Sequence, residues 1–98
     1  MAKYITLISW TEQGVRTYAD TVKRAEAGKA LAARMGGRLT DILWTLGPYD
    51  VVAVGEFPDD ESATATMLAL SAGGNVRTTT MRAFDSTEIA AIVAKAQS

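Results

Sequence analysis

The sequence lacks two residue types entirely, because its 98 residues include no cysteine and no histidine. Without cysteine there is no disulfide, no thiolate metal ligand and no cysteine nucleophile. Without histidine there is no imidazole base, no histidine zinc ligand and no proximal haem ligand. Carboxylates, tyrosine and lysine are the reactive groups that remain. We therefore expect no metal site and no cofactor.

An excess of charge of either sign is also missing. The chain has 10 Lys and Arg residues against 11 Asp and Glu residues, for a net charge of -1. No cluster of basic residues is present that would neutralise a series of phosphates. No segment has the three-part pattern of a signal peptide or the length of a membrane-spanning helix. We expect a cytoplasmic protein that binds neither nucleic acid nor membrane.

What the sequence does contain is a regular series of strand and helix patterns, which we interpret as one domain over residues 1–98. Asp59, Asp60 and Glu61 are interpreted as the cap and first turn of a helix rather than as metal ligands. The expected elements are a strand over 3–9, a long helix over 12–35, strands over 38–45 and 50–57, a helix over 60–72, a strand over 75–84, and a short helix that Asp85 caps and that ends near Ala96.

This order is βαββαβ with a helical tail, which predicts an α+β sandwich of the ferredoxin-like type. In that topology the sheet order is 4-1-3-2 and all neighbouring strands are antiparallel. The topology brings three segments to one end of the sheet, namely residues 9–11, 45–50 and 74–77. The start of the long helix lies there too and is expected to offer free backbone N–H groups near Gln13 and Gly14.

The hairpin turn at residues 47–50 is the centre of this expected site. Gly47 and Pro48 favour a tight turn between two apolar runs, and Tyr49 and Asp50 follow them. The candidate ligand-binding residues are those that the three segments contribute: Trp10, Thr11, Tyr49, Asp50, Asn75 and Arg77. Arg77 would anchor an anion, and the aromatic rings would stack on a flat ligand.

Three functions fit these residues. The first, which we favour, is a homo-oligomeric small-molecule-binding protein with a pocket at the sheet end formed by the turn at residues 47–50. The second is a cofactor-free enzyme, such as an isomerase or an oxygenase-like protein, with Asp50 as base and Tyr49 or Arg77 stabilising an oxyanion. The third is an assembly module without a ligand, in which Asp50 and Arg77 form a structural ion pair. In a purely architectural turn, Tyr49 packs on the strand ends and Asp50 accepts backbone N–H bonds.

Both faces of the predicted sheet are largely apolar, yet two helices cover only one of them. We expect a second copy to cover the other face, giving a homodimer of the dimeric α/β barrel kind or a higher oligomer. In the alternative arrangement, the tail helix folds over this face in a monomer. That helix carries only a short apolar stripe: Ile89, Ile92 and Val93.

The chain also resembles the GYD-domain family of small, mostly bacterial proteins. The family's Gly-Tyr-Asp motif appears as Gly47, Tyr49 and Asp50, with Pro48 inserted. Further similar segments lie at matching spacing along the chain: Trp10-Thr11-Glu12-Gln13-Gly14, Gly36-Gly37, Gly74-Asn75-Val76-Arg77-Thr78 and Arg82-Ala83-Phe84. The resemblance implies a ferredoxin-like domain that forms oligomers. It implies no activity.

Overall fold

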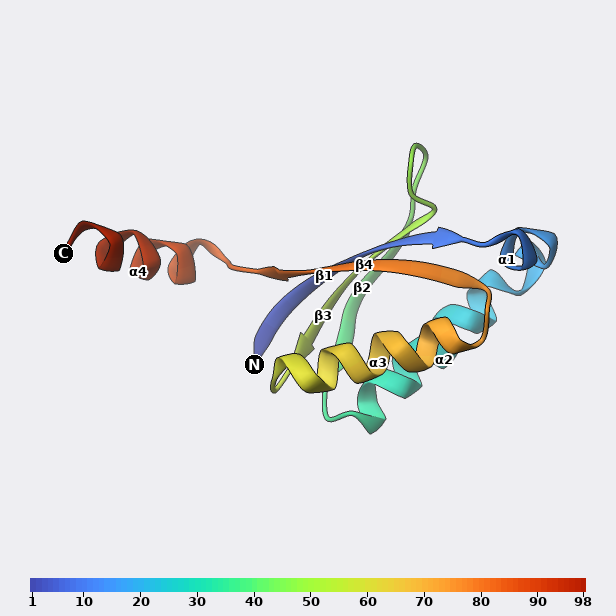
Figure 1. Ribbon diagram of the computed structural model, residues 1–98, viewed down its shortest axis with the longest axis horizontal. Helices are drawn as coiled ribbons and strands as arrows, with labels where there is room; N and C mark the ends of the chain where they lie inside the picture. The colour runs from blue at the N-terminus through green and yellow to red at the C-terminus, as the bar shows by residue number, and fades with distance from the viewer.

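The computed structural model describes residues 1–98 (Figure 1). Four strands form one antiparallel sheet in the order β2-β3-β1-β4, and α2 and α3 lie on one face of it. The predicted α+β ferredoxin-like fold and its sheet order are confirmed. The elements are β1 (Ala2–Trp10), α1 (Glu12–Arg16), the 3-10 turn η1 (Tyr18–Asp20), α2 (Thr21–Arg34), β2 (Arg38–Trp44), β3 (Val51–Phe57), α3 (Asp60–Ala72), β4 (Val76–Ala83) and α4 (Ser86–Gln97).

The prediction of one continuous helix over residues 12–35 is wrong, because the chain leaves the helical path at Thr17. The backbone of Thr17 has φ -110° and ψ 35°, and its hydroxyl donates to the carbonyl of Gln13 at 3.1 Å. Arg24 then donates to the carbonyls of Thr17 and Gly14, both at 3.1 Å. A guanidinium therefore satisfies the carbonyls that end α1, in place of the N–H groups of a further helical turn.

Strict alternation along β1 and β3 decides which residues enter the core. Every second side chain of each strand is buried beneath the helices: Tyr4, Thr6 and Ile8 on β1, with Val51, Ala53 and Phe57 on β3. Ala32 of α2 and Ala63 of α3 pack against Tyr4 and Phe57. The ring of Phe57 meets that of Tyr4 edge to face, with 5.8 Å between their centroids. The core is therefore one layer between the helices and one sheet face.

The other sheet face, which we call the open face, carries the alternate residues of the strands. Its centre consists of two directly opposed pairs, Leu7 with Val52 and Ile5 with Val54. Leu43 of β2 pairs with Val52, and Met81 of β4 pairs with Ile5, so one apolar row reaches the β2 border and the neighbouring row reaches the β4 border. Leu43 is 63% exposed and Met81 is 44% exposed. Neither α2 nor α3 covers this face (Figure 1).

The C-terminal helix α4 projects from the end of β4, away from the sheet and the other helices (Figure 1). Its start is fixed by a capping box in which Asp85 accepts from the N–H of Glu88 and Glu88 accepts from the N–H of Asp85. No residue of α4 is buried. The alternative in which the tail helix covers the open face is therefore not the arrangement of this structure. None of the helices is long and apolar enough to cross a membrane.

Candidate functional site

The three segments that the topology predicts at one end of the sheet do meet there, joined by hydrogen bonds. Asp50 N–H donates to the carbonyl of Ile8 at 2.9 Å, and Thr11 N–H donates to the carbonyl of Asn75 at 3.0 Å. Within the hairpin turn, Thr45 donates through its N–H to the carbonyl of Asp50 and through its hydroxyl to the carbonyl of Tyr49. The turn stands out from the sheet (Figure 1), with Gly47 at φ 116°.

The carboxylate of Asp50 accepts a hydrogen bond from the backbone N–H of Trp10 at 2.8 Å. This bond ties the turn to the end of β1, which is the architectural role considered for Asp50. The carboxylate forms no ion pair with Arg77. One carboxylate oxygen is thus held by the backbone, so this geometry gives no support to Asp50 as a catalytic base.

Thr11 and Asn75 belong to a hydrogen-bond network that joins the β1–α1 connection to the α3–β4 connection. The Thr11 hydroxyl donates to the carbonyl of Gly74 at 2.6 Å and accepts from Gly14 N–H at 3.1 Å. The side-chain amide of Gln13 donates to the Asn75 side chain at 3.0 Å. The N–H of Gly14, expected to be free, is therefore occupied, and α1 is only 5 residues long. These polar groups hold the two connections together.

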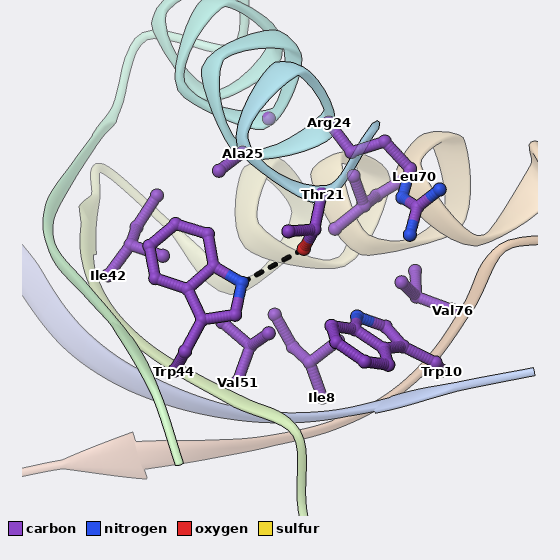
Figure 2. Close-up of a pocket in the computed structure, with 11 residues that line it drawn as sticks. Ile8, Trp10, Thr21, Arg24, Ala25, Ile42, Trp44, Val51, Leu70 and Val76 are labelled. Atoms are coloured by element: carbon purple, nitrogen blue, oxygen red, sulfur yellow. Dashed lines mark hydrogen bonds between the residues drawn. The ribbon is translucent and has the colours of Figure 1, made fainter. Parts of the chain in front are cut away.

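Trp10 lies on the helix side of the sheet, opposite Trp44, where both rings wall a small cavity (Figure 2). The cavity has a volume of about 50 Å³. Trp44 Nε1 donates to the hydroxyl of Thr21 at 2.9 Å, which fixes one ring against α2. The rest of the lining is mostly apolar: Ile8, Ala25, Ile42, Val51, Leu70 and Val76. Since organic ligands occupy roughly 300 Å³ or more, this space suits water-sized molecules.

Arg77 is the one charged candidate residue whose side chain has no partner within the chain. Its guanidinium makes no hydrogen bond or ion pair within the chain, and it lies in an open groove of about 510 Å³ with Thr11 and Thr78. Tyr49 lies at the base of the turn and lines neither this groove nor the tryptophan cavity. The six candidate residues therefore share one end of the sheet but line no common pocket.

A second polar cluster, which the sequence does not reveal, lies between α3 and β4. The hydroxyl of buried Tyr4 donates to the carboxylate of Asp60, and Arg82 lies 5.8 Å from the centroid of the Tyr4 ring. The hydrogen bond to Asp60 and burial together raise the pKa of Tyr4 to about 12. The groove beside this cluster has a volume of about 380 Å³, and Thr64 and Thr80 also line it. The sequence identifies Asp60 only as a first-turn helix acid.

Comparison with known proteins identifies the family of this chain. The structure defines a small α+β domain with one covered and one open sheet face, and the sequence profile of the GYD domain matches residues 4–93. The chain belongs to the GYD-domain family. One relative, from Thermus thermophilus, is named glutamine synthetase and cystathionine beta-lyase binding protein. It is 33% identical over 84 residues, which cover 85% of this chain and 88% of the relative.

Proposed function

We propose that this protein is a non-catalytic binding protein that holds another protein on the open face of its sheet. The observation that carries the proposal is the uncovered apolar row from Leu43 through Val52 and Leu7, with Ile5 and Val54 beside it. A contiguous apolar surface of this kind marks an interaction site in a small protein.

The charged side chains of the open face lie around this apolar centre. Lys3, Glu56 and Arg38 occupy neighbouring positions in one cross-strand row, and Arg38 pairs with Glu56 at 2.6 Å. Asp41 lies at one border and Arg77 at the opposite corner. An apolar centre with a polar rim is the usual composition of a protein–protein interface.

The name of the Thermus relative supports a protein as the occupant of this face. That relative is named for binding two enzymes, glutamine synthetase and cystathionine beta-lyase. For this chain we therefore propose a metabolic enzyme as partner. A second copy packed sheet to sheet, as expected from the sequence, would bury the same residues and is the competing occupant.

A charge placed on the open face separates these possibilities. Immobilised protein would be exposed to purified glutamine synthetase and to purified cystathionine beta-lyase, and binding measured by biolayer interferometry. Val52→Glu and Leu43→Glu should abolish binding, because a buried unpaired carboxylate is strongly unfavourable. Val22→Glu is the matched control, since Val22 is exposed on α2.

Loss of binding in the open-face variants alone supports the proposal. Equal binding by all variants, or binding of neither enzyme, contradicts it. Sedimentation of the same variants tests the competing occupant. If Val52→Glu splits an oligomer and neither enzyme binds the wild type, the open face is occupied by a second copy.

A second candidate function is anion binding in the groove beside Thr11, because the Arg77 guanidinium has no partner within the chain. Calorimetric titration with phosphate and with acetate would test it. Heat of binding that disappears in Arg77→Ala but persists in Asn75→Ala would assign the anion to the guanidinium.

A further inference from the structure

The outer border of β4 is an uninterrupted strand edge. β4 pairs with β1 over eight consecutive positions, from Ala83 opposite Lys3 to Val76 opposite Trp10, without a shift of register. It has no strand on its other side. Half of its backbone N–H and C=O groups therefore point outward without a partner, which is a template for pairing with another strand.

The opposite border of the sheet is built differently. The pairing of β2 with β3 shifts between Leu39 and Asp41, so a bulge interrupts that edge at Thr40. Bulges and prolines are the usual devices that prevent strand addition, and β4 contains neither. Of the two borders, only β4 offers a regular edge.

Arg77 and Arg82 could guard the β4 edge by charge, but Arg82 is turned back onto its own chain. Its guanidinium donates to the carbonyls of Lys3 and Ala83 and pairs with Glu88 at 3.4 Å. It also lies 4.5 Å from the centroid of the Phe84 ring. The middle of the edge thus consists of three uncharged residues, Thr78, Thr79 and Thr80.

We infer that β4 pairs antiparallel with β4 of a second copy, so that the two sheets join edge to edge. Directly opposed residues of two antiparallel strands lie on the same face of the joined sheet. The twofold axis therefore passes through a residue rather than between two residues, and that residue is either Thr79 or Thr80. Centring on Thr79 places Arg77 opposite Met81 of the second copy. Centring on Thr80 places Arg77 opposite Ala83. In both registers the arginines avoid their own counterparts, and threonine pairs occupy the centre, where they are favourable.

The surroundings of β4 also suit this pairing. The twofold axis of an edge-to-edge pair runs perpendicular to the sheet, so α3 of both copies lies on the same side. The groove between α3 and β4 in each copy then opens toward the other. Leu68, which is 69% exposed, lies one helical turn from Thr64 of the groove lining and would face the second copy.

The projecting helix α4 gains a contact surface in the same arrangement. It follows directly from the end of β4 (Figure 1), and in an antiparallel pair it runs past the start of β4 of the second copy. Its exposed side chains Ile89, Ile92 and Val93 would be covered there. This edge contact leaves the centre of the open face, formed by Ile5, Leu7, Val52 and Val54, free for a partner protein.

Single cysteines in a chain that has none test the pairing directly. Directly opposed residues of antiparallel strands have Cα atoms about 4.5–5.5 Å apart, which is within disulfide range. Under mild oxidation, Thr79→Cys or Thr80→Cys should form a covalent dimer in most of the protein. Asp41→Cys, on the exposed β2 border, is the matched control and should stay monomeric.

Sedimentation of the full chain completes the test. Thr79→Lys, or Thr80→Lys if Thr80 is the position that crosslinks, should weaken the dimer at least about tenfold, because it brings like charges together across the axis. The serine variant at the same position should not. A monomeric wild-type chain overturns the inference. So does a dimer in which neither threonine position crosslinks, or in which Asp41→Cys crosslinks equally well, because that dimer uses another surface.

Discussion

The Asp50 carboxylate and the Trp10 backbone N–H lie 2.8 Å apart, and their hydrogen bond joins the hairpin turn to the end of β1. The two residues are 40 positions apart in the sequence. The Asp of the Gly-Tyr-Asp motif therefore has a structural partner in this chain. The same bond links the motif to Trp10, which walls the small cavity at the sheet end.

The effect of replacing Asp50 on stability should depend on whether the new side chain can still accept the hydrogen bond from the Trp10 N–H. Asp50→Ala leaves the part-buried Trp10 N–H without a partner and should lower the free energy of unfolding by about 1–3 kcal/mol. Asp50→Asn keeps an acceptor oxygen and should lose less. Urea unfolding followed by circular dichroism measures both. Arg77→Ala is the control and should stay within about 0.5 kcal/mol of wild type. An unchanged Asp50→Ala would mean that the bond is dispensable.

Tyr4→Phe tests the polar cluster of Tyr4, Asp60 and Arg82 through the pH dependence of stability. Because the folded pKa of Tyr4 is about 12 against 10.0 for a free tyrosine, the folded state holds the phenolic proton more tightly. The stabilisation is complete below pH 10 and is lost as the pH rises toward 12. Wild-type stability should therefore fall across this window, and Tyr4→Phe should remove that part of the slope.

Tyr18→Phe is the matched control for this measurement, since Tyr18 is 66% exposed. It should leave the free energy of unfolding within about 0.5 kcal/mol of the wild type at neutral pH. At neutral pH, Tyr4→Phe should also cost about 1.5–3 kcal/mol, because a hydrogen bond to a carboxylate is lost from a buried residue. Parallel pH profiles of wild type and Tyr4→Phe would show that Tyr4 does not titrate in this way.

The strands, their order and the meeting of the three segments could be predicted because each depends on local patterns plus one topology. Alternation along β1 and β3 gives both faces, and Gly47 with Pro48 gives the turn. The break at Thr17 could not be predicted, since it depends on Arg24 reaching back to the carbonyls of α1. Val15, Tyr18 and Val22 keep a helical spacing, yet all three are exposed.

The sequence predicts a pocket at the sheet end, but within one chain the six candidate residues line no common pocket. Composition and turn chemistry identify Thr11, Asp50 and Asn75 as polar residues at the sheet end. They do not show that the side chains of Thr11 and Asp50 and the carbonyl of Asn75 form hydrogen bonds with backbone groups of neighbouring segments. The pairing of Tyr4 with Asp60 spans 56 positions and has no local signal. Long-range side-chain partners of this kind become visible only in the folded structure.

Gly28→Ala should stabilise the protein. A Cβ atom at this position would lie 3.7 Å from Leu70 Cδ1 and 3.8 Å from Leu39 Cδ1, which are ordinary packing distances. Gly28 lies within α2 and lines the cavity between the tryptophans. Alanine should therefore add about 1 kcal/mol through helix propensity and also fill space in the cavity.

Gly37→Ala provides the opposite case for the same thermal unfolding measurement. A Cβ atom there would lie 2.4 Å from Phe57 Cδ1 and 2.5 Å from the Glu56 carbonyl oxygen, so the backbone or the core ring must move. We expect a lower melting temperature for Gly37→Ala and a higher one for Gly28→Ala. If Gly28→Ala is also destabilising, the space between Gly28, Leu39 and Leu70 does not accept a methyl group.

Asp85→Ala should unwind α4 without weakening the rest of the domain. The substitution removes the side chain that caps Glu88 N–H, at a cost of about 1 kcal/mol to a helix that has no buried residue to compensate. The helical signal in circular dichroism should fall, while the midpoint of urea unfolding followed by tryptophan fluorescence stays the same. Ser86→Ala is the control, because Ser86 makes no capping bond.

These measurements should be made at a protein concentration at which sedimentation shows a monomer. At higher concentration, a β4 edge dimer would cover α4 and restore part of its helicity, so a helical signal independent of concentration would mean that α4 has no partner.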